Sequence, residues 1–314
     1  MPDLQMPRGP ERDFIGYGEA PPHPRWPGGA RIAVNFALNV EEGSEYSPLE
    51  GDARTDTALT EGEGMDTGIE GRDLAAESMY EYGSRVGVWR IIRLFEDRGL
   101  PFTAFACALA LERHPALAGR IREIGADICC HGYRWEKHWL LGREQEREHI
   151  RLAIESLRRT VGRGPEGWCC RYGPSVHTRE LLVEAGISYD SDAYNDELPY
   201  WQKVGDRMQL IVPYSLVTND CKLVPRGIQT ADEFYALLRD AFDQLYEEGE
   251  TAPRMLNIGL HPRMAGHPGR ARGLARFLDH IRGHERVWIA RRADIAAHWR
   301  QNFPAPAGDL EGRP

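Results

Sequence analysis

The stretch Arg31–Gly43, RIAVNFALNVEEG, begins with an apolar run of strand length, RIAVNFAL (31–38), which is followed by the two adjacent carboxylates Glu41 and Glu42. Similar short apolar runs recur along the chain, and amphipathic stretches of helical period lie between most of them, such as 84–99, 143–162 and 231–249. The other runs are 102–107, 126–130, 167–170, 187–190, 209–214, 254–260 and 286–290. Repeated alternation of strands and helices predicts a parallel α/β fold, and about eight such units closed on themselves predict a distorted (β/α) barrel.

The composition limits the function classes. The chain has 314 residues, a net charge of −9 and no basic stripe, which argues against a nucleic-acid partner. There is no apolar run of membrane-spanning length, and the first residues lack the apolar core of a secretory signal. The six cysteines include two vicinal pairs, Cys129-Cys130 and Cys169-Cys170, which fit reduced thiols at strand ends. We therefore expect a cytoplasmic protein with no membrane partner.

The domain organisation follows from the irregular segments. Residues 1–30 are rich in proline and glycine and predict an N-terminal arm laid over the domain, whereas 304–314 predict a frayed tail. We expect 31–303 to form a single catalytic barrel. The stretch 41–71 is too long for an ordinary connection, and long loops of this kind are often functional.

Polar side chains of catalytic type follow many of the apolar runs. In a parallel barrel the C-terminal ends of all strands meet at one rim, which is where barrel enzymes place their active sites. The residues found there are Glu41, Glu42, His131, Arg171, Asp190, Asp192, Asp220 and His261. This set predicts hydrolysis of an amide-like bond, with a carboxylate taking a proton from water, a histidine protonating the leaving nitrogen and an arginine stabilising the oxyanion.

Five motifs, in order along the chain, resemble one known family. They are RDFIGYGEAPPHPRWPGGARIAVNFALNVEEG (12–43), SMYEYGSRVGVWRI (78–91), ICCHGYRWEKH (128–138), AYNDELPYW (193–201) and IGLHPRM (258–264). They resemble the allantoinase-like branch of the polysaccharide deacetylase (NodB-homology) superfamily, from about Arg12 to about Pro304. The resemblance implies a distorted (β/α) barrel, in agreement with the alternation of elements. The resemblance also implies assembly into a homo-oligomer, which the long N-terminal arm favours as well.

The resemblance assigns roles to individual residues. Metal-dependent members carry two adjacent aspartates, a base and a metal ligand, where this chain has Glu41 and Glu42. Their second motif supplies two histidines four residues apart on a helical turn; this chain keeps His131, but the other position is Trp135. The histidine acid matches His261, and the arginine motif matches Arg171, although its surroundings differ from the Gly-Arg-Thr run of allantoinases.

A metal remains the alternative to a metal-free site. His138, together with Glu42 and His131, is the ligand set to consider for a divalent ion such as zinc. On a helix, however, residues seven apart lie roughly 10 Å apart along the axis. Two histidine nitrogens on one zinc must come within roughly 3.5 Å. We therefore favour a site without a cofactor, in which Trp135 fills the space that a ligand would occupy.

The function expected from these residues is hydrolysis of a C–N bond other than a peptide bond. The leading hypothesis is an allantoinase-like opening of a cyclic amide (a ureide) by carboxylate-activated water. The catalytic residues would be Glu41, Glu42, His131, Arg171 and His261. The substrate-binding residues would be Trp135, Asp192, Trp201 and Asp220. Two alternatives stay open: a metal-dependent N-deacetylase of an acetylated sugar or polysaccharide, and a non-catalytic barrel that binds a small molecule.

Overall fold

The computed structural model describes residues 9–224 and 227–306. Its centre is a nine-stranded sheet in the order β6-β7-β5-β4-β3-β2-β1-β8, with β9 paired to the first half of β1. All pairs are parallel except the hairpin β6–β7. The strands are β1 Ile32–Val40, β2 Thr103–Ala106, β3 Asp127–Cys130, β4 Gly167–Trp168, β5 Tyr189–Asp190, β6 Tyr200–Val204, β7 Arg207–Ile211, β8 Arg254–Leu260 and β9 Val287–Ile289.

The sheet curls into an incomplete barrel. No ladder joins β7 to β8 among the described residues, and near that gap one isolated bridge pairs Asn219 with Gly259 of β8. The predicted distorted (β/α) barrel is confirmed. Each of the eight apolar runs overlaps a strand, but β6 was not predicted, because its polar sequence YWQKV lacks an apolar run.

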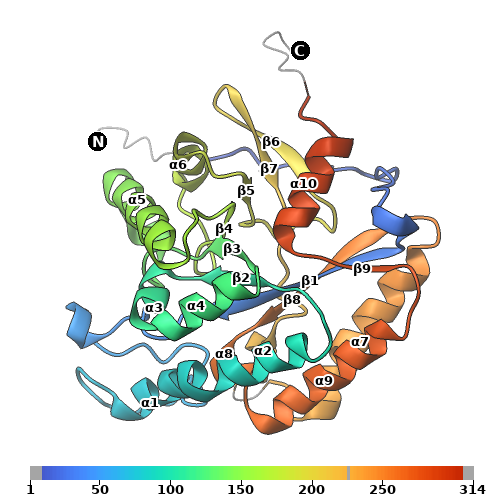
Figure 1. Ribbon diagram of the computed structural model, residues 1–314. Helices are drawn as coiled ribbons and strands as arrows, with labels where there is room; N and C mark the ends of the chain where they lie inside the picture. The colour runs from blue at the N-terminus through green and yellow to red at the C-terminus, as the bar shows by residue number, and fades with distance from the viewer. Residues whose placement is uncertain (1–8, 225–226, 307–314) are drawn as a thin grey trace.

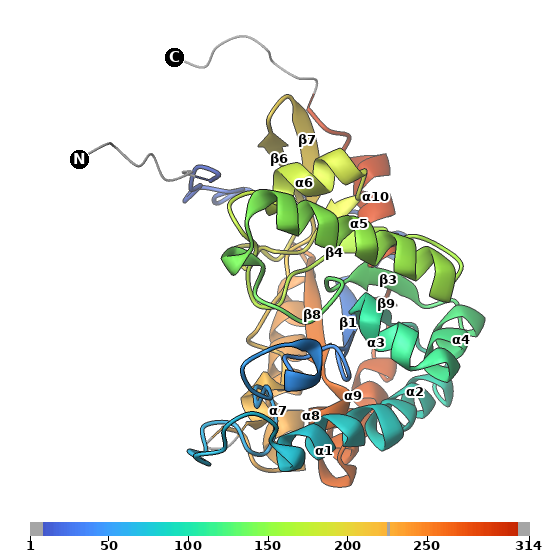
Figure 2. The same cartoon turned by 90° about the vertical axis from the view of Figure 1, so that its left-hand side faces the viewer.

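Helices cover the outside of the sheet (Figures 1 and 2). They are α1 Leu74–Tyr82, α2 Val88–Glu96, α3 Ala108–Arg113, α4 Pro115–Glu123, α5 Arg143–Thr160, α6 Thr178–Ala185, α7 Ala231–Glu248, α8 Pro262–Ala265, α9 Pro268–Arg282 and α10 Arg292–Asn302, with a π-helical turn at Gly83–Gly87 between α1 and α2. The three predicted amphipathic stretches coincide with α2, α5 and α7. In the described part of the chain, no helix is both long enough and apolar enough to cross a bilayer.

The core has two layers because successive side chains of a strand point to opposite faces. Along β1, Val34, Phe36 and Leu38 pack outward against the helices, whereas Ala33 and Ala37 face the barrel interior. The vicinal cysteines alternate in the same way: Cys130 and Cys170 belong to the outer layer, and Cys129 and Cys169 to the inner one. All six cysteines are free thiols, as expected.

The N-terminal segment is anchored to the barrel by an aromatic side chain. Trp26 is buried, donates its ring N–H to the Arg254 carbonyl at 3.1 Å, and packs its ring against Trp288 and Trp299. The predicted domain boundaries at 30 and 303 stay predictions, and most of the predicted C-terminal tail, from 307 on, lies outside the described residues.

Candidate active site

The parallel strands bring four of the predicted catalytic residues to one rim. Glu41 follows β1 directly, His131 follows β3, and His261 follows β8; Arg171 lies three residues after β4. All four are buried, with exposed fractions of 8% or less. Polar side chains so well shielded must be satisfied by one another or by a substrate.

Glu41 is the centre of this group. Its Oε1 lies 3.1 Å from Nε2 of His131 and 3.5 Å from Nε2 of His261, and its Oε2 accepts a hydrogen bond of 2.7 Å from Arg263. Neither histidine nitrogen is aligned with Oε1, which has no hydrogen-bond partner among the described residues. Oε1 is therefore the oxygen of Glu41 that can accept a hydrogen bond from a water molecule or a substrate beside the two histidines.

The two histidines are oriented from behind. Nδ1 of His131 lies 2.6 Å from the Cys169 carbonyl, which can only accept, so this nitrogen carries the hydrogen. Nδ1 of His261 lies 2.6 Å from Oδ1 of Asp220, whose Oδ2 accepts the backbone N–H groups of His261 and Ala265 at 2.7 and 3.1 Å. Asp220, expected to bind substrate, thus holds both the ring and the backbone of His261.

The charges in the group fix complementary protonation states. Burial would raise the pKa of Glu41, but the positive charges of His261 and Arg263 outweigh it and hold the pKa well below its usual range. Burial would lower the pKa of His261, but Glu41 and Asp220 raise it to about 9. At neutral pH the site therefore holds an ionised carboxylate beside a protonated imidazole, a base and an acid in the same place.

Arg263 is a residue that the sequence analysis missed. Its guanidinium is fully buried, contacts Glu42 Oε1 at 3.2 Å as well as Glu41, and donates through Nε to the Leu59 carbonyl at 3.0 Å. Burial raises the pKa of Glu42, although the charge of Arg263 opposes this. The position of Arg263, two residues after His261 in the quoted motif IGLHPRM, was the available clue.

Trp135 lies between two cations. Its ring is 3.6 Å from Cζ of Arg171 and 4.9 Å from Cζ of Arg263, and its buried Nε1 has no hydrogen-bond partner among the described residues. Arg171 is held by Asp56 from the 41–71 loop at 2.5 Å and by the Trp135 carbonyl at 3.0 Å. The loop expected to be functional therefore lies against the site.

Two glycines allow the helix layer to approach the carboxylates. A Cβ on Gly83 would stand 2.5 Å from Oε1 of Glu42 and 2.9 Å from the Arg263 nitrogen, and one on Gly87 would collide with the Pro262 carbonyl. Both glycines lie in the π-helical turn that packs on α8. This accounts for the spacing of the glycines in the motif SMYEYGSRVGVWRI.

Other predicted residues lie outside this group. Trp201, on β6, donates its ring N–H to the Phe303 carbonyl at 2.8 Å and packs on the inner core. Asp192 accepts the Cys170 N–H at 2.8 Å, and burial together with Asp190 raises its pKa to about 7. Its carboxylate is thus already used to hold the backbone beside Arg171.

The metal-ligand alternative is not supported by the geometry. Residues 131–137 are irregular, with bends at 133–135 and no helix, so the distance between residues seven apart on a helix does not apply to His131 and His138. His138 packs its ring on Trp168, and burial lowers its pKa to about 3. In the described chain Glu42, His131 and His138 do not bring their ligand atoms within 4.8 Å of one another. With Trp135 at the second histidine position and Arg263 already paired with both carboxylates, these residues do not fit the metal of the deacetylases.

The most evident cavities are elsewhere. One of about 410 Å³ lies between β8, α7 and the segment that follows β7, lined by Tyr214, Thr218 and Asn257 among others, and one of about 640 Å³ lies near Cys221 and Leu237. Neither is lined by Glu41 or His261. The chemistry of the polar cluster is more specific than the volume of either cavity, so we place the candidate site at the cluster.

The chain is similar to known proteins along most of its length. Residues 72–189 match the family model described as polysaccharide deacetylase. A Schizosaccharomyces pombe protein that carries the name polysaccharide deacetylase is 40% identical over 94% of this chain and 99% of its own.

Solved structures agree with this match. A Pseudomonas aeruginosa PAO1 protein described as a polysaccharide deacetylase has 45% identity and a TM-score of 0.89, covering 95% of this chain and 100% of its own. The structure described as Puue allantoinase has 45% identity and a TM-score of 0.90, covering 95% of this chain and 99% of its own.

Proposed function

This chain belongs to the polysaccharide deacetylase family, in its allantoinase-like branch, and is a hydrolase of C–N bonds other than peptide bonds; from this premise we propose that it opens a cyclic amide of the ureide class. One observation carries the proposal. Oε1 of the ionised Glu41 lies 3.5 Å from Nε2 of the protonated His261 in a shielded site.

The proposed reaction uses these groups in turn. Glu41 takes a proton from a water molecule, whose oxygen bonds to the carbonyl carbon of the ring amide. The oxyanion that forms is stabilised by Arg171. Both hydrogen bonds that this side chain donates to described residues come from Nη1, so its other N–H groups are available for the oxyanion. His261 then gives the proton on Nε2 to the leaving nitrogen, and the C–N bond breaks.

Arg263 supplies the positive charge that this site needs. It forms ion pairs with both Glu41 and Glu42, offsets part of their negative charge and holds Glu41 in place. A fixed cation costs no reorganisation during the reaction, which is how preorganised charges stabilise a transition state. We therefore propose catalysis by protein groups alone, with allantoin as the first candidate substrate; its ring bears both the carbonyl oxygens and the N–H groups that Trp135, Arg171 and Glu41 would pair with.

An N-deacetylase acting on an acetylated sugar is the second candidate, because the family match and two of the relatives carry that name. The experiment that separates them uses the purified chain, with and without chelator treatment. It is given allantoin or an N-acetylglucosamine oligomer, and ring-opened product or free acetate is measured. We expect ring opening that survives the chelator. Acetate release that is lost on chelation and restored by zinc would instead establish the deacetylase.

A further inference from the structure

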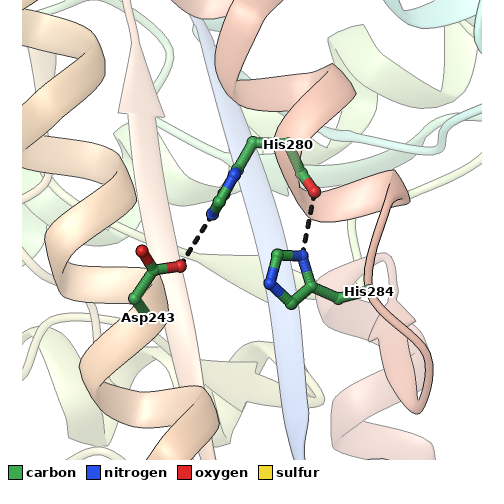
Figure 3. Close-up of side chains that lie close together, drawn as sticks. All are labelled: Asp243, His280 and His284. Atoms are coloured by element: carbon green, nitrogen blue, oxygen red, sulfur yellow. Dashed lines mark hydrogen bonds and ion pairs between the residues drawn. The ribbon is translucent and has the colours of Figure 1, made fainter.

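A second group of ionisable side chains lies between α7 and α9 (Figure 3). Nε2 of His280 lies 2.7 Å from Oδ1 of Asp243, and the ring centroids of His280 and His284 are 4.7 Å apart. One nitrogen or oxygen from each of the three residues lies within 4.8 Å of the others, and this is the one such group of three or more in the described chain.

The protonation of His284 prepares it to bind a metal. Its Nδ1 lies 3.0 Å from the His280 carbonyl, which can only accept, so Nδ1 carries the hydrogen and Nε2 keeps its lone pair. Figure 3 shows the other ring nitrogen of His284 on the side of the ring that faces Asp243. Metal-binding histidines are commonly oriented by this same donation of the outer N–H to a backbone carbonyl.

Neighbouring aromatic rings hold both histidines. The Phe242 ring lies 5.7 Å from the ring of His280 and 5.1 Å from that of His284, and the Tyr246 ring lies 5.0 Å from that of His284. The ligand side chains are partly open, with 22% of His280 and 39% of Asp243 exposed. Packed rings limit the rotamers of the histidines, while the open side leaves room for a water molecule as a fourth ligand.

The donor set selects the kind of ion. Two imidazole nitrogens and one carboxylate oxygen suit zinc and similar divalent transition metals, whereas calcium and magnesium prefer oxygen ligands alone. Ligands on a tetrahedral zinc stand roughly 3.3 Å apart for bonds of about 2 Å. The pair at 2.7 Å must therefore open slightly and His284 must close in, which are small side-chain adjustments on the partly open side of the group. The competing cation, Arg239, is 4.0 Å from the other oxygen of Asp243.

This group is far from the candidate active site. Tyr246, in contact with His284, also packs against Arg31: its ring centroid lies 5.0 Å from Cζ of Arg31. Arg31 directly precedes the first residue of β1. Glu41 follows the last residue of β1. Nine strand residues at about 3.3 Å each separate the two places by roughly 30 Å. An ion at this end of the barrel cannot touch the substrate.

We propose that Asp243, His280 and His284 form a zinc-type site that ties α7 to α9 and takes no part in catalysis. The ends of two long helices that flank β8 and β9 would be joined by one ion. A consequence concerns metal analysis: a chain purified with one zinc per molecule is then no evidence for zinc at Glu42 and His131.

The test uses the full chain, stripped with chelator and then titrated with zinc alone or with cobalt(II), whose absorption spectrum reports tetrahedral coordination. Metal content and the thermal midpoint are measured for the parent, for His284→Ala and for His280→Gln. Asp240→Asn, an exposed carboxylate on α7, is the matched control. For the parent and the Asp240→Asn control we expect one ion per chain and a zinc-dependent rise in Tm. For both histidine variants we expect a zinc affinity at least tenfold weaker. Hydrolysis should be unchanged in all four proteins.

Three results would overturn the proposal. The first is a parent with no zinc-dependent rise in Tm. The second is a zinc affinity in both His284→Ala and His280→Gln that equals the affinity of the parent. The third is hydrolysis that depends on zinc in the parent and is lost in the two histidine variants, which would remove the separation from catalysis. Metal content and Tm are measured without substrate. The first two results therefore decide whether zinc binds here even if the chain proves not to open a cyclic amide.

Discussion

At the scale of single residues, the candidate site consists of opposite charges held close together. Glu41 is kept ionised by His261 and Arg263, and His261 is kept protonated by Glu41 and Asp220. Each group supports the charge of the other, so removing one changes the protonation of its partner.

Glu41→Gln and His261→Ala should each lower kcat by about 10²–10⁴-fold on the true substrate, since each removes a positioned proton-transfer group. Steady-state kinetics check this, and circular dichroism confirms that the variants are folded. Trp201→Phe, at a side chain held to Phe303, is the control and should keep near-parental turnover. Near-parental rates in either of the first two variants would refute the assignment.

The pH profile should show an alkaline limb near 9, because His261 acts as an acid and loses its proton as the pH rises through its pKa of about 9. The low pKa of Glu41 places the acidic limb below its usual range. Asp220→Asn removes a negative charge that raises the pKa of His261, so the alkaline limb should move down by about one unit or more. The measurement is kcat against pH for both proteins. An alkaline limb that stays in place in the variant would show that His261 is not the titrating acid.

At the scale of elements, the site depends on how closely the π-helical turn Gly83–Gly87 packs on α8. Glu42 and Arg263 occupy the space that a side chain on Gly83 would need. The backbone of this turn is therefore one wall of the carboxylate pair.

Gly83→Ala should reduce activity by at least tenfold and lower Tm, because the new methyl group would displace Glu42 or the backbone of Arg263, and overpacking typically costs about 1–3 kcal/mol. Gly119→Ala in α4, where nothing lies within 4 Å of the new Cβ, is the control. It should leave activity unchanged and keep or raise stability by up to about 1 kcal/mol, because alanine favours the helix. Equal effects of the two substitutions would argue against the close approach.

The elements also show what the sequence alone could predict. The runs that became β1, β3 and β8 are apolar and end in Glu41, His131 and His261, so both the strands and the shared rim followed from a local pattern. Arg263 was missed because its role depends on its hydrogen bond to Glu41, a residue 222 positions away in the sequence. Trp201 was predicted to bind substrate because of the motif in which it stands. Its ring N–H instead bonds to Phe303, 102 residues further along the chain, and a local motif does not predict such a contact.

At the scale of the whole molecule, one exposed patch lies beside the mouth of the barrel. The ring of Trp139 lies 5.9 Å from that of Tyr172, whose carbonyl accepts a hydrogen bond of 2.7 Å from the Tyr194 hydroxyl. These three side chains and Leu140 are between 41% and 69% exposed and follow β3, β4 and β5. Contiguous exposed apolar and aromatic surface of this kind commonly marks a protein–protein contact.

We therefore expect the purified chain to be a symmetric homo-oligomer that buries this patch, since closed symmetric assemblies are the commonest form of soluble oligomer. Trp139→Asp would place an unpaired charge in the contact, and light scattering coupled to size exclusion should show the mass falling toward that of one chain. Leu74→Asp, at an exposed position of the first turn of α1, is the matched control: an acidic residue is favourable at a helix N-terminus, so neither its fold nor its assembly should change. A parent that is monodisperse and monomeric at micromolar concentration would contradict the expectation outright, whereas an oligomer that persists in Trp139→Asp would move the contact to another surface.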